Sequence, residues 1–471
     1  MIKINANQLL KQRFGFNTFH PGQAETLEAL QAGENVLAIL PTGAGKSLIY
    51  QLYSYLINQP VVIVSPLLSL MNDQVERIRY QGSSQVVAIN SEYNWQERQK
   101  ILANIKHYRY IFISPEMLNQ PDIIKSLARI KLGLFVIDEA HCISKWGVDF
   151  RPDYLSLKNN LKRLGNPQTL MLTATASKKV QTDIIKKLGI SHYESVIESV
   201  NRPNIFLGVH QTENELDKQE YLLDTLSELK GPGIVYFSSK RMANLMADMI
   251  NAKTKLKAAP YHADLSNEDR FKIQHQFMDN ELDVICATNA FGMGIDKSDI
   301  KFVIHYHLPQ DLESYMQEIG RAGRNGQPSI AILLYATGDE QITQNLIENS
   351  LPTERDYKNY VNHKYQYIEE QIKRLLDFYF QHGYSENQIK LIFKNETTLK
   401  LKELDKLIDY INCEGCRRKL LLANFDEKFD DHTEICCNLN QANINLKPYD
   451  YLVEKQARKA NNWKTIINQL F

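Results

Sequence analysis

Short apolar runs separated by helical patterns set the strongest limit on how this chain can fold. Such runs, bounded by turn residues, are typical of strands buried on both faces of a parallel sheet. In the first part of the chain they lie at Asn35–Leu40, Pro60–Ser65, Tyr110–Ser114, Gly133–Ile137 and Thr169–Thr173. The pattern then restarts, at Gly233–Phe237, Asp283–Ala287, Phe302–His305 and Ile330–Tyr335. The sequence therefore predicts an α/β fold with two parallel sheets, each covered by helices.

The composition is that of a globular chain without a charge bias. Of 471 residues, 43% are hydrophobic and 23% are charged, and 55 lysines and arginines balance 55 aspartates and glutamates. Any nucleic-acid site is therefore expected to be a local patch. Residues 1–12 contain no apolar core followed by a cleavage site, and no apolar stretch reaches the ~18 residues that span a bilayer. We expect a cytoplasmic protein that does not bind a membrane.

A phosphate-binding loop is predicted where the first apolar run ends. The run leads into Pro41-Thr42-Gly43-Ala44-Gly45-Lys46-Ser47 and then into an apolar helix. In such a loop small residues let backbone N–H groups face phosphates, Lys46 reaches the β- and γ-phosphates, and Ser47 holds Mg²⁺. Leu40 stands where the strict pattern has glycine, so an ordinary glycine-rich turn is the alternative. The strand–loop–helix context favours phosphate binding.

An acidic pair, Asp138 and Glu139, directly follows the apolar run that ends at Ile137. A carboxylate at the carboxyl end of a parallel strand faces the ligand crevice. Asp138 is therefore expected to bind Mg²⁺ through its water shell, and Glu139 to orient or deprotonate an attacking water. The alternative for an isolated acidic pair is a solvated turn. Its place after a buried strand, downstream of a phosphate loop, favours an ATPase.

Further motifs carry a family resemblance. Phe19-His20-Pro21-Gly22-Gln23 precedes the phosphate loop, and the aromatic-rich stretch Cys142–Tyr154 follows the acidic pair. Together the motifs resemble the RecQ family of superfamily 2 DNA helicases, over roughly residues 9–335 and a segment near 413–437. The resemblance implies two RecA-like lobes, and a Gln23 amide that hydrogen-bonds the adenine edge. His20 stands where the family usually has arginine. The nucleotide-binding set is Gln23, Thr42, Gly43, Ala44, Gly45, Lys46, Ser47 and Asp138.

The resemblance also implies loops that grip the DNA backbone rather than read the bases. Val64–Gln74 resembles the first strand-tracking motif, and Cys142–Tyr154 resembles the loop that senses DNA and couples it to ATP hydrolysis. Val148 and, in the second lobe, Asp264 depart from the residues common in the family. The alternative for the aromatic loop is that it tucks its rings into the core. DNA contacts are assigned to Ser69, Asn72, Trp146, Phe150, Arg151, Thr288 and Asn289.

The segment Gln317–Gly326 resembles the last motif of the family and contains two arginines three residues apart. Because such residues share one face of a helix, we expect Arg321 and Arg324 to project together and stabilise the transferring phosphoryl group. The alternative is a pair of surface arginines on an exposed helix. The catalytic set is Lys46, Asp138, Glu139, Gln317, Arg321 and Arg324.

Four of the six cysteines crowd near the C-terminal end, which here favours a metal over disulfides. The resemblance implies a Cys₄ zinc module, whose Cys-Arg-Arg matches Cys416-Arg417-Arg418, although the spacing of the last two cysteines differs. Four thiolates suit tetrahedral Zn²⁺. His432 is a spare ligand, and buried reduced cysteines are the alternative. The predicted ligands are Cys413, Cys416, Cys436 and Cys437.

We expect four regions in this chain. They are a RecA-like ATPase lobe at 1–205, a second lobe at 206–340, a helical zinc-binding module at 341–445 and a helical tail at 446–471. Only 34 residues follow Cys437, so we expect a short form without winged-helix or further helical domains.

The predicted function is that of an ATP-dependent DNA helicase. We expect a monomer that moves 3′→5′ on single-stranded DNA and unwinds tailed duplexes in repair or recombination. An RNA helicase, the first alternative, would favour aspartate in place of His141 and Ser-Ala-Thr in place of Thr173-Ala174-Thr175. A non-catalytic ATP-binding scaffold, the second, predicts loss of Lys46, Glu139 or an arginine of the last motif, and all are present.

Overall fold

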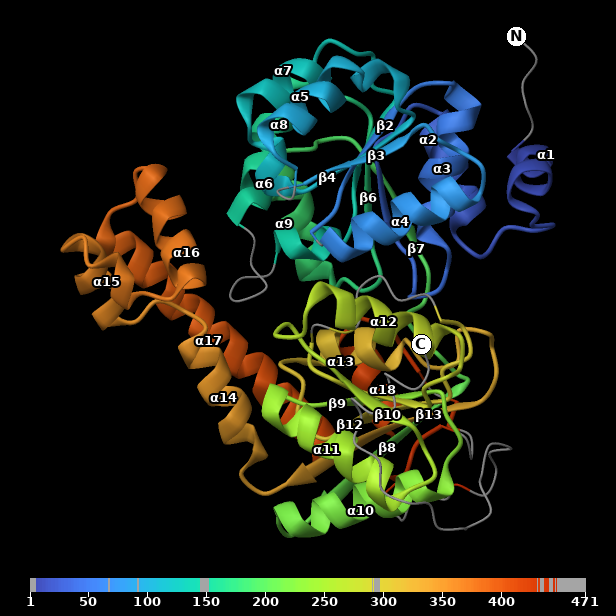
Figure 1. Ribbon diagram of the computed structural model, residues 1–471, viewed down its shortest axis with the longest axis vertical. Coiled ribbons are helices and arrows are strands. Elements are labelled where there is room, and N and C mark those ends of the chain that lie inside the picture. Colours follow the sequence, from blue (N-terminus) through green and yellow to red (C-terminus); the bar gives the residue numbers. More distant parts are fainter. Residues whose placement is uncertain are drawn as a thin grey trace. The chain divides into compact units, whose positions relative to one another are not determined.

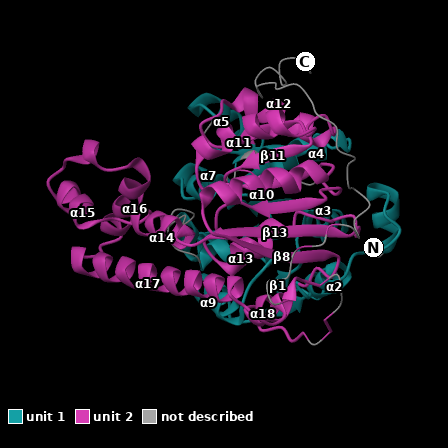
Figure 2. Cartoon of the chain, turned by 90° about the horizontal axis from the view of Figure 1, so that it is seen from below, with its two compact units in different colours: residues 1–200 teal, residues 201–471 magenta. Residues whose placement is uncertain are grey.

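The computed structural model describes residues 6–446, except 67, 91–92, 145–151, 290, 292–296, 430, 433–435, 440–443 and 445. The chain forms two compact units that divide between Val200 and Asn201, coloured separately in Figure 2. Within the described ranges, no helix combines the length and the apolar character that crossing a bilayer requires.

The first unit, residues 1–200, is built on a seven-stranded parallel sheet in the order β3-β4-β2-β5-β6-β1-β7. Its strands are β1 Val36–Ile39, β2 Val61–Val64, β3 Val86–Ile89, β4 Tyr110–Ile113, β5 Leu134–Ile137, β6 Thr169–Thr173 and β7 Glu194–Ile197. Its main helices are α1 Ala6–Leu9, α2 Gln23–Gln31, α3 Lys46–Ile57, α4 Leu68–Tyr80, α5 Trp95–Ala103, α6 Pro115–Leu118, α7 Pro121–Leu127, α8 Leu157–Arg163 and α9 Lys178–Leu188. Short π and 3₁₀ turns cover Leu10–Phe14, Ile105–His107, Ala140–Ile143 and Pro152–Ser156.

Helices cover both faces of this sheet, so the unit has two hydrophobic cores (Figure 1). Side chains alternate across a strand. Leu37 and Ile39 of β1 accordingly belong to one core, and Val36 and Ala38 belong to the other. Burial on both faces explains why the strands read as continuous apolar runs.

The second unit, residues 201–471, contains a six-stranded parallel sheet in the order β10-β11-β9-β12-β13-β8. Its strands are β8 Ile205–Thr212, β9 Gly233–Tyr236, β10 Ala258–Tyr261, β11 Val284–Ala287, β12 Phe302–His305 and β13 Ser329–Ala336. Its helices are α10 Glu215–Glu228, α11 Lys240–Lys253, α12 Asn267–Met278, α13 Leu312–Ile319, α14 Asp339–Asn349, α15 Glu354–Val361, α16 Glu370–Gln381, α17 Glu386–Ile411 and α18 Arg417–Ala423. A 3₁₀ turn covers Tyr365–Tyr367.

The helices after β13 form an arm on the second sheet. α14 and α17 run side by side, and α15 and α16 lie at the end away from the sheet (Figures 1 and 2). A buried ion pair lies at the base of the arm, where Nζ of Lys218 on α10 is 2.6 Å from Oδ2 of Asp339, the first residue of α14. α17 then leads back to α18, which carries the cysteine segment.

The predicted α/β class with two parallel sheets is confirmed, and each predicted apolar run contains a strand. The sequence missed β3, β7, β8 and β10, which are the edge strands of the two sheets. The expected link near Asn201–Gly208 already contains the start of β8, because the break at Pro203 is followed at once by the strand.

Candidate nucleotide and metal sites

The predicted phosphate loop lies between β1 and α3. Gly43 and Gly45 have left-handed backbone angles, with φ of 89° and 67°, and a Cβ on Gly45 would lie 2.7 Å from Nε2 of Gln23. α3 begins at Lys46, whose Nζ donates a hydrogen bond to the Leu40 carbonyl at 3.2 Å. The loop therefore presents Lys46 at a helix N-terminus, where an anion is favoured.

Leu40, the departure from the strict phosphate-loop pattern, fills space beside a glycine. Leu40 is fully buried, and a Cβ placed on Gly22 would collide with its side chain. Gly22 also has a left-handed φ of 79° and caps α2. The leucine therefore docks the adenine-motif segment against the loop, which accounts for its presence there.

Gln23, assigned to the adenine edge, lies against the phosphate loop. It is buried, and its Nε2 donates to the carbonyls of Ala44 at 2.8 Å and Gly45 at 3.1 Å. Its Oε1 accepts from the backbone N–H of His20 at 2.9 Å. The side chain of His20 takes no part in this contact. Gln23 would thus have to exchange its Nε2 partners in order to donate to an adenine, whereas Oε1 can accept a second hydrogen bond.

The acidic pair follows β5, as expected. Glu139 has a left-handed φ of 48°, and its N–H donates to Oδ1 of Asp138 at 3.0 Å. Burial and then the Glu139 carboxylate raise the pKa of Asp138 to about 7, while Lys46 acts in the opposite direction. Burial and the neighbouring carboxylate therefore outweigh the positive charges of Lys46 and His141 at Asp138.

The donors near this pair fit Mg²⁺. Tyr50 is buried and lies one turn along α3 from Ser47. Burial and the Asp138 carboxylate raise the pKa of Tyr50, whereas a hydrogen bond with Ser47 lowers it. Tyr50 thus connects the two residues assigned to the metal. A hydroxyl and a carboxylate are the oxygen ligands that Mg²⁺ takes from proteins. A divalent cation would also favour the ionised form of the buried Asp138 carboxylate.

His141 joins the acidic pair to the end of β6. Its Nδ1 lies 3.3 Å from Oε2 of Glu139 and 3.1 Å from Oγ1 of Thr173, which donates to the Thr175 carbonyl at 3.0 Å. Burial lowers the pKa of His141, but the contacts with Cys142 and Glu139 outweigh it and raise the pKa to about 10. The imidazole can therefore hold Glu139 in one orientation while linking it to the segment Thr173–Thr175.

The expectation that Arg321 and Arg324 share a helical face is wrong. α13 ends at Ile319, and the arginines lie on the turns that follow, where Gly323 and Gly326 have φ of 57° and 81°. Gly323 and Gly326 lie beyond the end of α13 and turn the chain through left-handed angles, so the segment does not continue as a helix. Arg321 is nevertheless buried rather than exposed.

Arg321 interacts with Tyr236 of β9, and Arg324 acts electrostatically on the same ring. Gln317, the remaining member of the catalytic set in this unit, lies half-buried on the last turns of α13. The segment Arg202-Pro203-Asn204, which the sequence identified only as a helix breaker, contacts the turn with both polar side chains. Nothing in the sequence indicated that this segment contacts the last motif, because the two lie more than 100 residues apart.

The residues assigned to DNA are distributed over both units. Ser69 and Asn72 lie on α4, and Asn72 is exposed. Thr288 and Asn289 follow β11, with Thr288 buried and Asn289 exposed. Trp146, Phe150 and Arg151 lie outside the described residues.

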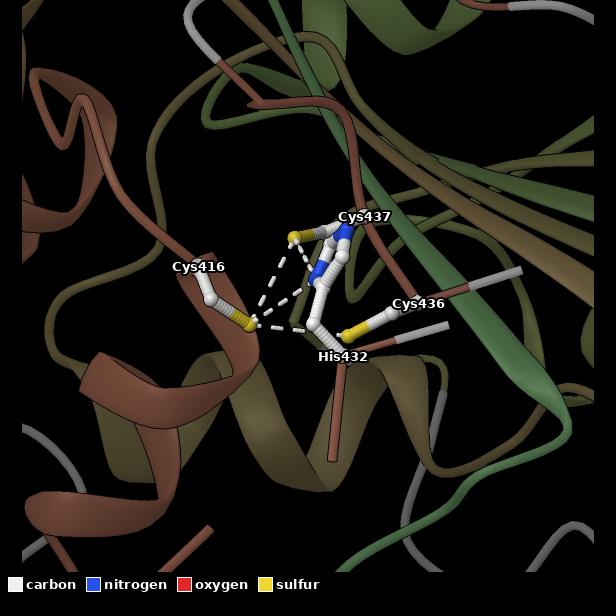
Figure 3. Close-up of side chains that lie close together, drawn as sticks. All are labelled: Cys416, His432, Cys436 and Cys437. Carbon is white, nitrogen blue, oxygen red and sulfur yellow. Dashed lines mark hydrogen bonds between the residues drawn. The ribbon is translucent and has the colours of Figure 1, made fainter. Parts of the chain in front are cut away.

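Three cysteines and a histidine meet in the second unit, as Figure 3 shows. The ligand atoms of Cys416, His432, Cys436 and Cys437 all lie within 4.8 Å of one another. Cys413, which was expected to be a ligand, lies outside this group, and His432 takes its place. In the sequence, His432 lies between the two cysteine segments, and this place made it a spare ligand.

The spacing of these atoms fits tetrahedral zinc. Sγ of Cys416 is 3.6 Å from Sγ of Cys436 and 3.8 Å from Sγ of Cys437, and Nδ1 of His432 is 3.4 Å from Sγ of Cys416. Four ligands around zinc, with Zn–S bonds of about 2.3 Å, place sulfur atoms about 3.8 Å apart. The donor set is therefore a Cys₃His candidate metal centre.

The cluster is attached to the edge of the second sheet. The Leu207 N–H of β8 donates to the Cys436 carbonyl at 3.1 Å, and the Asn438 N–H donates to the Leu207 carbonyl at 3.2 Å. Leu207 and Cys437 thereby form a parallel bridge. The side chain of Asn438 extends the pairing, since it both donates to and accepts from the backbone of Val209.

Family models match both units. A DEAD/DEAH box helicase model matches residues 20–183, and a helicase conserved C-terminal domain model matches residues 217–326. Among solved structures, the Mycobacterium smegmatis helicase Lhr bound to single-stranded DNA and AMP-PNP has a TM-score of 0.60 at 22% identity. The likeness covers 74% of this chain and 50% of Lhr, and at that identity it concerns the fold alone.

Curated relatives are similar over nearly the whole chain. A probable ATP-dependent DNA helicase RecS from Bacillus subtilis is 40% identical, over 98% of this chain and 97% of its own length. The ATP-dependent DNA helicase RecQ from the same organism is 35% identical, over 92% of this chain and 66% of its own length. A putative ATP-dependent RNA helicase, R290 from Acanthamoeba polyphaga mimivirus, is 33% identical over 92% of this chain and 71% of its own length.

Proposed function

The chain belongs to the RecQ family of ATP-dependent DNA helicases, and on that premise we propose that it moves 3′→5′ along single-stranded DNA and unwinds the duplex ahead of it. One observation carries the ATPase part of the proposal, while the direction of movement follows from the family: Lys46, Asp138, Glu139 and His141 gather where strands β1 and β5 end. A phosphate loop beside a buried acidic pair has the parts that ATP hydrolysis requires. A non-catalytic scaffold has no need of the paired carboxylates.

The residues of the first unit have separate roles in the proposed reaction. The loop N–H groups and Lys46 bind the β- and γ-phosphates, and Ser47 and Asp138 hold Mg²⁺. Mg²⁺ bound to Ser47 and Asp138 would supply positive charge at the phosphate oxygens. Glu139 orients the attacking water and accepts its proton. His141 keeps the Glu139 carboxylate in place and transmits its position to the segment Thr173–Thr175.

We assign Arg321 and Arg324 to the charge that develops on the transferring phosphoryl group, as arginine fingers. Two facts support this assignment: Arg321 is buried next to Tyr236, and a rigid set of hydrogen bonds holds its turn. Gln317, shortly before them on α13, is assigned to the same group of catalytic residues.

The DNA contacts are proposals that follow from the family motifs. Asn72 and Asn289 are exposed, which suits contact with a phosphate backbone. The aromatic loop is assigned to DNA sensing because base stacking on an aromatic ring contributes about 1–3 kcal/mol per base without reading sequence. We further propose a monomer that acts in the cytoplasm on tailed duplexes during repair or recombination.

A zinc ion is proposed at Cys416, His432, Cys436 and Cys437. Zinc bound there would tie α18 to the strand-like segment beside β8. Its role would be structural, because four protein ligands leave no open coordination position for substrate.

The test measures ATP hydrolysis by the full chain with single-stranded DNA, with RNA and without nucleic acid, together with unwinding of 3′-tailed and 5′-tailed duplexes. We expect stimulation by DNA and unwinding of the 3′-tailed duplex only. Glu139→Gln serves as the control, since it should retain ATP binding but lose both activities. Stronger stimulation by RNA than by DNA would favour the RNA helicase alternative, and hydrolysis equal to that of Glu139→Gln would favour the scaffold.

A further inference from the structure

The turn that carries Arg321 and Arg324 is held by an arginine from the start of the second unit. Nη1 of Arg202 donates to the Gly320 carbonyl at 3.0 Å, and Nη2 donates to the carbonyls of Ala322 at 2.9 Å and Gly323 at 2.7 Å. These carbonyls flank Arg321 on both sides. Because the guanidinium presents its donors in a fixed plane, one side chain fixes three points of this turn.

Asn204 holds the same turn further along. Its Nδ2 donates to the Gly323 carbonyl at 2.8 Å and the Gln327 carbonyl at 2.9 Å. Gly323 has a left-handed φ of 57°, and a Cβ placed there would collide with the Asn204 amide. Arg202 and Asn204 therefore lie in direct contact with the backbone that orients the two arginines.

A second arginine, Arg418 of α18, holds Arg202 in turn. Nη1 of Arg418 donates to the Arg202 carbonyl and to Oδ1 of Asn201, each at 2.9 Å, and Nη2 bonds to the Ile205 carbonyl. Arg418 is only 3% exposed, so these bonds are shielded from water. A charged donor buried in this way has one well-defined arrangement, since leaving it unsatisfied is costly.

Arg418 also touches the cysteine cluster. Its Nε lies 3.4 Å from Sγ of Cys436, and its Nη2 donates to the Cys436 carbonyl at 3.2 Å. An unbroken series of contacts thus leads from Cys436 through Arg418 and Arg202 to the backbone on both sides of Arg321. The links are hydrogen bonds in buried or half-buried surroundings, which form a contiguous physical route for coupling.

We propose that Arg202 and Arg418 are positioning residues, which transmit the placement of the cysteine cluster to the turn of Arg321 and Arg324. The inference rests on the proposed function of those two arginines in phosphoryl transfer. Neither positioning residue contacts ATP in this scheme. They act by keeping Arg321 within the small range of positions in which it stabilises the transition state. The cluster thereby affects hydrolysis as well as folding.

The test compares Arg202→Lys with wild type in the full chain. Lysine retains the charge but cannot satisfy three carbonyls at once. We expect kcat of the DNA-stimulated ATPase to fall roughly 10- to 100-fold, the loss typical of a misplaced catalytic group. KM for ATP and zinc content by elemental analysis should stay at wild-type values, and thermal melting should remain one cooperative transition, which loss of folding would not permit.

Two further variants keep the test decisive. Asn204→Ala removes two bonds to the same turn and should lower kcat by a smaller factor, so it substitutes for Arg202→Lys if that protein fails to fold. Arg109→Lys is the matched control, because Arg109 is also half-buried and donates to the Ser54 carbonyl at 2.8 Å, but it lies in the first unit. Its kcat should equal that of wild type.

Arg321→Ala separates failure of this inference from failure of the proposed function. If Arg321→Ala is slow and both Arg202→Lys and Asn204→Ala hydrolyse ATP at the wild-type rate, the positioning role is overturned alone. If Arg321→Ala itself retains wild-type kcat, the function of the turn is overturned, and the positioning role with it. Combining Arg202→Lys with Arg321→Ala should lower kcat by less than the product of the two single losses, because both changes remove the contribution of Arg321.

Discussion

Replacing His432 with alanine should weaken zinc binding far more than replacing Cys413 with serine. His432 places Nδ1 3.4 Å from Sγ of Cys416 and 3.9 Å from Sγ of Cys437, whereas Cys413 lies outside the ligand group. Structural zinc sites in finger peptides bind with roughly 10–16 kcal/mol, or roughly 2.5–4 kcal/mol for each of four ligands. Since each 1.4 kcal/mol is tenfold in affinity, His432→Ala should weaken binding by roughly 10²- to 10³-fold.

Two measurements test this prediction. Elemental analysis of the full chain, purified without chelator, should give about one zinc per wild-type chain. Competition with a chromophoric chelator then gives the affinity of each variant. Cys413→Ser, the control, should bind zinc as wild type does. Equal losses in the two variants would refute the ligand geometry, and a well-folded wild type without metal would leave buried reduced cysteines as the correct interpretation.

The remaining predictions concern the nucleotide site, DNA coupling and stability. Lys46→Ala should lower the rate of ATP hydrolysis more than tenfold, which corresponds to a rise in the barrier above about 1.4 kcal/mol. Binding of single-stranded DNA should persist, and its loss would contradict this prediction. Trp146→Ala, a prediction from the sequence alone, should keep basal hydrolysis but lose stimulation by DNA and unwinding. Lys218→Met should destabilise the second unit by about 3–5 kcal/mol in thermal or denaturant unfolding, because it leaves the buried Asp339 carboxylate without its cation. A melting curve like that of wild type would disprove the Lys218 argument.

The interior strands of both sheets could be predicted from the sequence, whereas the edge strands β7 and β10 lack the same signal; the edge strands β3 and β8 carry apolar runs and were missed all the same. Interior strands are buried on both faces, and this leaves a continuous apolar run in the sequence. β7 is largely exposed and has no such run. β10 contains Pro260, which argues against a strand, and its edge position in the sheet is what allows the proline there.

Local chemistry made the nucleotide site predictable. The phosphate loop and the acidic pair each depend on a short segment directly after a strand, so their residue order determines their placement. The hydrogen bonds of Gln23 to Ala44 and Gly45 depend instead on how α2 docks against the loop. Leu40 departs from the strict phosphate-loop pattern, and the structure explains this residue by its packing against Gly22.

The sequence did not assign a role to residues whose partners lie far away along the chain. His432 was only a spare ligand, because nothing in the spacing shows that it reaches Cys416 and Cys437. Arg418 and Arg202 are 216 positions apart, and they meet where the cysteine segment pairs with the edge of the second sheet. Such a contact requires the folded sheet first. A change at β8 that disturbs this pairing should therefore affect both zinc binding and hydrolysis, although β8 carries no residue assigned to either.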